Sequence, residues 1–82
     1  MEKILAEILR RERKRKNISQ EQLAVYSGID RSYYSKIERG ENRPTLNMLI
    51  KITSSLGIKL SDVIREIEEK SPNSKISFKR RR

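Results

Sequence analysis

The most constraining feature of this chain lies at residues 19–43, where two short helical segments are joined by a tight turn. Ser19 and Gln22 have the spacing of a capping box, which predicts the start of the first helix. Gly28 predicts its end, because glycine adopts the left-handed conformation that terminates helices without steric cost. Ile29 is expected to anchor the turn in the core, and Asp30 is expected to cap the second helix. The pattern therefore predicts two helices held at a fixed angle.

The second of these helices has an apolar stripe and a polar, basic face. Tyr33, Tyr34 and Ile37 follow helical spacing, and Gly40 is expected to end the helix. The positions left exposed are Arg31, Ser32, Ser35, Lys36 and Arg39. These residue types suit a DNA major groove, where arginine can make two bonds to guanine and cations can contact phosphate. A helical hairpin can also serve only for packing, but here spacing, caps and basic surface agree on DNA binding.

Composition excludes several classes of function. A chain of 82 residues is one small domain, which buries only about 60% of its unfolded surface, so oligomerisation is an expected supplement. Cysteine and histidine are both absent, which removes disulfides, thiolate metal sites and the commonest general base and zinc ligand. No group of carboxylates, lysines or tyrosines is set apart from a structural or binding role. We therefore expect no enzymatic activity, no cofactor and no metal site.

The net charge of +9 favours a polyanionic partner, although it is unevenly placed. Residues 71–82 hold five basic residues and no acidic ones, follow a Ser-Pro break and contain little apolar mass. We expect residues 1–70 to form the folded domain and residues 71–82 to form a flexible basic tail. The tail either adds sequence-independent attraction to phosphate or only aids solubility, and Ile76 with Phe78 could pair weakly with another chain.

The N-terminal sequence does not resemble a targeting or anchoring segment. No apolar run approaches the roughly 20 residues of a membrane span. The basic residues follow the first apolar stretch instead of preceding it, unlike those of a signal peptide. We therefore expect a cytoplasmic protein without a membrane partner.

Three further helices are predicted from apolar spacing and end signals. The first runs from residue 2 or 3 to residue 16, with a basic end that either contacts phosphate or is simply solvated. Asn17 can adopt the left-handed position after it. Thr45 and Gly57 bound a helix over residues 46–56, and Ser61 with Asp62 opens another that ends near residue 70. With no credible strand, the fold class is all-α, a compact five-helix domain.

Several spaced motifs in this order carry a family resemblance. SQEQLA, SGIDRS, KIERGENRPTL and LGIKLSDVI, within residues 4–69, resemble the lambda-repressor-like (Xre/Cro-like) helix-turn-helix DNA-binding family. The string DRSYYS and the small size are similar to controller proteins of restriction-modification systems, although phage and mobile-element repressors share most of this pattern. The resemblance implies a transcriptional regulator. Whether it represses or activates is left open.

The resemblance also implies roles for individual residues. Base contacts fall on Arg31, Ser32, Ser35 and Lys36, and on Tyr33 unless that ring packs instead. Contacts to the DNA backbone are expected from Gln20, Arg39, Asn42 and Arg43. Arg13 and Glu38 match an internal ion pair that ties the first helix to the third, and Tyr34 takes a core position. The chain departs from the family at Glu12, where an aliphatic residue is usual, and at Asn17, which replaces a common glycine.

These features predict sequence-specific binding of double-stranded DNA by a homodimer. Two-fold symmetry implies a palindromic operator whose half-sites lie about one helical turn, ~34 Å, apart. The dimer interface is expected on the last helix, from Val63, Ile64 and Ile67, and on the end of the helix before it. Two alternatives stay open: an antitoxin-like module that binds a regulatory protein partner, and a nucleic-acid binder, RNA included, that tolerates many sequences.

Overall fold

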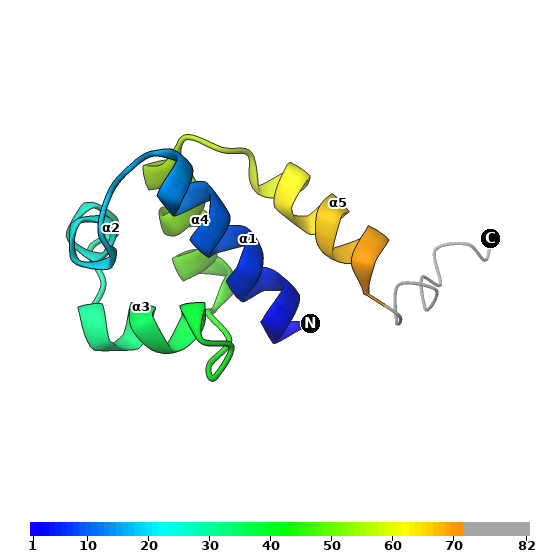
Figure 1. Cartoon of the computed structure of the whole chain (residues 1–82), viewed down its shortest axis with the longest axis horizontal. Helices are drawn as coiled ribbons and strands as arrows, with labels where there is room; N and C mark the ends of the chain where they lie inside the picture. Colours follow the sequence, from blue (N-terminus) through cyan, green and yellow to red (C-terminus); the bar gives the residue numbers. More distant parts are fainter. Residues whose placement is uncertain (72–82) are drawn as a thin grey trace.

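The computed structural model describes residues 1–71, which form five α-helices (Figure 1). These are α1 (Glu2–Arg15), α2 (Gln20–Ser27), α3 (Arg31–Glu38), α4 (Leu46–Leu56) and α5 (Leu60–Lys70). The described residues contain no strand, so the predicted all-α, five-helix fold is confirmed. The predicted tail, apart from its first residue, and the predicted pairing of Ile76 and Phe78 lie outside the described residues.

Three of the helices begin at the caps that the sequence predicts. The Ser19 hydroxyl accepts the Gln22 N–H at 3.0 Å, and the Gln22 amide oxygen accepts the Ser19 N–H at 2.9 Å, which completes a capping box for α2. Asp30 caps α3 and Thr45 caps α4, each through its side-chain oxygen. Asn17 has a φ of +57°, so it takes the left-handed position that was expected of it after α1.

The start of α5 differs from the prediction. The helix begins at Leu60, and its N-cap residue Lys59 makes no side-chain cap bond. Ser61 and Asp62 are therefore inside the first turn, not at its start. Leu60 is half-buried against the core, so packing of an apolar side chain fixes this helix start where a polar cap was expected.

One hydrophobic core joins all five helices. Its members include Leu9 from α1, Leu23 from α2, Tyr34 from α3, Ile52 from α4 and Val63 from α5, each at most 3% exposed. Helix α1 contacts both α3 and α5, which lie on different sides of it (Figure 1). Because α1 contacts both α3 and α5, it sets the position of each relative to the core.

The apolar face of α4 is narrower than the sequence suggests. Leu49, Ile52 and Leu56 are buried, whereas Leu46 and Ile50 are 64% and 45% exposed. These two side chains lie one turn apart on a surface that the other residues of the range 1–71 leave exposed. Among residues 1–71, none of the helices combines the length and the apolar composition that a membrane span requires.

Candidate nucleic-acid interface

The angle between α2 and α3 is fixed by a short, hydrogen-bonded turn. Gly28 has a φ of +69°, a conformation that strains residues with a Cβ atom. The N–H of Ile29 donates to the Ala24 carbonyl at 3.0 Å, and the Ile29 side chain packs against the core. The turn therefore presents α3 to solvent at one defined orientation, as the sequence predicts.

The outer face of α3 gathers polar and basic side chains. A shallow surface hollow is lined by Arg31, Ser32, Ser35, Lys36 and Arg39. Arg31, Ser32 and Lys36 are exposed, and Ser35 is half-buried at the edge of the helix. The structure thus brings together four of the five predicted base-contacting residues and Arg39, which was predicted to contact the backbone. We call these five residues the recognition face.

Tyr33, the remaining predicted base contact, is partly withdrawn from this face. Its ring is half-buried and packs against the core, and its hydroxyl donates to the Arg43 carbonyl at 3.3 Å. The side chain therefore links α3 to the loop that precedes α4. It lies at the edge of the recognition face, where its contact with DNA stays a prediction.

The predicted contacts to the DNA backbone flank the recognition face. Gln20 is the first residue of α2, and its side-chain amide donates to Glu38 at 2.9 Å. This bond uses one of the two N–H groups of the Gln20 amide, and contact of this end of α2 with phosphate stays a prediction. Asn42 and Arg43 lie in the loop after α3, where the Arg43 guanidinium pairs with Glu2 at 2.7 Å.

The inner side of α3 is held by a buried ion pair between Arg13 and Glu38. Arg13 Nε lies 2.6 Å from Glu38 Oε2, and the side chains are only 12% and 2% exposed. Tyr34 also donates its hydroxyl to Glu38, at 2.6 Å, and Gln20 donates its amide. One carboxylate therefore joins α1, α2 and α3 behind the recognition face.

This cluster determines the charge of Glu38. Burial by itself would raise the pKa of the carboxyl, but hydrogen bonds from Arg13, Tyr34 and Gln20 outweigh burial and leave the pKa below its ordinary value. Burial, together with the adjacent Glu38, raises the pKa of the Tyr34 hydroxyl, which stays a protonated donor. This hydroxyl bond was not predicted from the sequence, although the spacing of four residues between Tyr34 and Glu38 was a signal for it.

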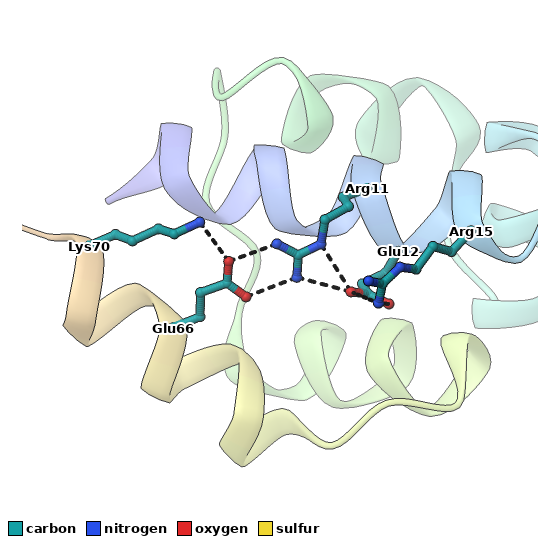
Figure 2. A network of polar contacts seen from close by, with 5 residues as sticks. All are labelled: Arg11, Glu12, Arg15, Glu66 and Lys70. Carbon is teal, nitrogen blue, oxygen red and sulfur yellow. Dashed lines mark hydrogen bonds and ion pairs between the residues drawn. The ribbon is translucent and has the colours of Figure 1, made fainter.

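A second polar network joins α1 to α5 (Figure 2). Arg11 reaches Glu66 with both terminal nitrogens, at 2.7 and 2.9 Å, and also contacts Glu12. Arg15 pairs with Glu12, and Lys70 pairs with Glu66. Hydrogen bonds from Arg11 and Lys70 lower the pKa of Glu66 to about 2.

This network accounts for the unusual Glu12. The residue is 8% exposed, at the edge of the inner face of α1, and its carboxylate lies between Arg11 and Arg15. The Arg11–Glu66 pair joins residues 55 positions apart, so no local sequence signal could have identified it.

Two of the residues predicted for a dimer interface are used inside the single chain. Val63 and Ile67 are 3% and 8% exposed and belong to the hydrophobic core. Ile64 lies outside the buried face of α5 and is 39% exposed. Of the three predicted residues, Ile64 alone keeps a large apolar surface open to a partner.

Comparisons with known proteins identify the family. A helix-turn-helix family model matches residues 9–63. The chain is 44% identical over 62 residues to the control protein C.MunI of a Mycoplasma species, an alignment that covers 74% of this chain and 84% of that protein. It is 45% identical over 56 residues to the control protein C.SmaI of Serratia marcescens, covering 68% and 67%.

A longer relative is the HTH-type transcriptional regulator SlrR of Bacillus subtilis, 43% identical over 61 residues. That alignment covers 73% of this chain but only 40% of SlrR. These relatives are named as regulators or control proteins, not as enzymes. The chain therefore belongs to the helix-turn-helix family of transcriptional regulators, which confirms the Xre/Cro-like resemblance.

Proposed function

We propose that this helix-turn-helix protein is a controller-type regulator that binds a palindromic DNA operator as a homodimer, with α3 of each subunit in a major groove. The observation that carries the proposal is the recognition face, where five polar and basic side chains gather on one side of α3. The opposite side of α3 is fixed to the core by Tyr34 and Glu38. A rigid helix with one free face of this chemistry suits base recognition.

Arg31 is the principal base-reading residue in this proposal. It opens α3, is exposed, and lies beside Ser32 in the surface hollow. An arginine that donates two bonds to guanine contributes about 1–3 kcal/mol of discrimination against a wrong base. Lys36 and Ser35, one turn further along, extend the contact to neighbouring bases.

The contacts to phosphate are proposed on either side of α3. The first turn of α2, which begins at Gln20, offers backbone N–H groups to one phosphate. Asn42 and Arg43 lie in the loop after α3 and offer side-chain donors to another. Such contacts fix the orientation of α3 on the duplex without reading sequence.

The homodimer is proposed to form through α5, with Ile64 at its centre. Ile64 is exposed, whereas its neighbours Val63 and Ile67 are buried in the core of the single chain. A symmetric contact would bury this side chain and place two copies of α3 on the same face of a duplex, about one helical turn apart.

The base-reading role is tested by comparing two arginine variants. Operator sites are first selected from random duplexes, and affinities are then measured on the selected site and on a scrambled one. Arg31→Ala should lower the ratio of the two affinities by about five- to 150-fold, which corresponds to the loss of one base contact. Arg43→Ala should weaken both affinities by similar factors, because its proposed partner is a phosphate. An unchanged ratio for Arg31→Ala would mean that another residue reads the sequence.

The homodimer is tested by Ile64→Asp. Because Ile64 is exposed, the variant should keep its helices but sediment as a monomer at concentrations where the wild type is a dimer. Arg65→Ala is a control at the next position of α5, also exposed, and should leave the dimer intact. Circular dichroism and analytical ultracentrifugation measure the two properties. A dimer that survives Ile64→Asp would place the interface elsewhere.

A further inference from the structure

The loop after α3 holds Glu41 in a fixed position. Gly40 has a φ of +75°, and its N–H donates to the Ile37 carbonyl at 3.0 Å. The N–H of Glu41 donates to the Lys36 carbonyl at 2.9 Å. These two bonds make the turn that commonly ends an α-helix at glycine. The Glu41 backbone is therefore fixed beside the last turn of α3.

The Glu41 carboxylate binds Arg39, one of the residues of the recognition face. Arg39 donates to it through Nε at 2.9 Å and Nη2 at 3.2 Å, and donates through Nη1 to the Ser35 hydroxyl at 2.8 Å. These bonds use three of the five N–H groups of the guanidinium. One N–H remains on each terminal nitrogen, a pair that can donate to two acceptors on a guanine or a phosphate.

Neither folding nor attraction to DNA explains a carboxylate in this place. The Arg39 and Glu41 side chains are 52% and 54% exposed, and ion pairs at such sites add little to stability. A negative charge beside the recognition face also repels phosphates, so it weakens binding to every duplex. Among the described residues the Glu41 carboxylate contacts Arg39, so we consider the effect of this contact on the Arg39 side chain.

We infer that Glu41 is a positioning residue for DNA recognition, which favours the Arg39 conformation that lies against Ser35 on the recognition face. An unrestrained arginine side chain can rotate to whichever phosphate is near. An Arg39 guanidinium that lies against Ser35 can donate only to an acceptor at one position relative to α3. A duplex supplies an acceptor at that position only when it is docked correctly. Glu41 thus lowers affinity for unrelated DNA and raises the preference for the operator. This inference rests on the proposed function, because it concerns the same face.

The test compares Glu41→Gln with a matched control, Glu7→Gln. Glu7 lines the same cleft between α1 and the end of α3, is exposed, and has no ion pair with any residue of the range 1–71. Each substitution removes one negative charge, but only Glu41→Gln releases Arg39. Affinities are measured on the selected operator and on a scrambled duplex of equal length.

Glu7→Gln should raise both affinities by a similar factor of about two, the size of a unit-charge interaction across water. Glu41→Gln should raise the affinity for the scrambled duplex but lower the operator preference by about two- to fivefold, the bias that an exposed ion pair exerts on its side chains. In an Arg39→Ala background, Glu41→Gln should no longer change the preference, because its effect passes through Arg39.

A preference that Glu41→Gln leaves unchanged would overturn the inference and assign Glu41 to charge repulsion alone. A change that persists in the Arg39→Ala background would also overturn it, since Glu41 would then act by another route. If the wild-type protein binds operator and scrambled duplex equally, the proposed function itself fails. Thermal unfolding of each variant, followed by circular dichroism, shows that the fold is retained.

Discussion

Helix α1 carries two ionic clusters that differ in their exposure to water. Toward α3, the side chains of Arg13 and Glu38 are 12% and 2% exposed. Toward α5, those of Arg11 and Glu66 are 42% and 22% exposed. The first cluster fixes the recognition helix, and the second joins the helix proposed for dimerisation. The ionic contact toward α3 is therefore buried, whereas the one toward α5 is partly hydrated.

The physical reason is the cost of desolvating a charge. A buried pair contributes little net stability, because taking both charges out of water offsets their attraction, but losing one partner leaves a charge unpaired in the interior. An exposed pair loses little when one partner is removed, because water solvates the other. Substitutions in the two clusters should therefore lower the free energy of unfolding by different amounts.

The largest effect is expected for Arg13→Met, which leaves Glu38 buried without its cation. The free energy of unfolding should fall by about 3–5 kcal/mol. Arg11→Met is the matched change in the exposed cluster and should cost less than about 1 kcal/mol. Urea unfolding followed by circular dichroism measures both. Equal decreases in the free energy of unfolding would show that burial of the ion pair does not determine the cost of removing its cation.

A smaller effect is expected for Tyr34→Phe, which keeps the buried ring and removes only the hydroxyl that donates to Glu38. The free energy of unfolding should fall by about 1.5–3 kcal/mol, the range for a hydrogen bond to a charged group. Tyr33→Phe is the control, because its hydroxyl makes a 3.3 Å bond at the surface. The same urea titration should show less than about 0.5 kcal/mol for this control. A similar loss in both variants would contradict a special role for the buried carboxylate.

The smallest effect concerns the pH dependence of the α1–α5 network. The pKa of Glu66 is lowered to about 2 in the folded chain, whereas the pKa of glutamate in an unfolded chain is about 4.3. The contribution of Glu66 to the free energy of unfolding is therefore fully present above about pH 4.3 and is lost as the pH falls toward 2. Glu66→Gln should therefore cost less than about 1 kcal/mol at neutral pH and almost nothing near pH 2. Urea unfolding of both proteins across this range measures the difference. A difference that stays constant with pH would exclude a charged role for Glu66.

The sequence alone determined the local features of this fold. The capping box of α2, the Asp30 and Thr45 caps and the left-handed Asn17 were all predicted, because each depends on residues within one turn of the helix end. Periodicity likewise predicted the polar face of α3. These signals are local, so the sequence carries them directly.

Tertiary structure decided which surfaces meet. Periodicity grouped Val63, Ile64 and Ile67 as one apolar set. Packing of α5 against α1 and α4 buries Val63 and Ile67 but leaves Ile64 exposed. The family resemblance marked Glu12 as a departure, but it did not reveal that Arg11 links Glu12 to Glu66 on α5. Such pairings depend on how distant helices pack, which the spacing of residues along one helix does not specify.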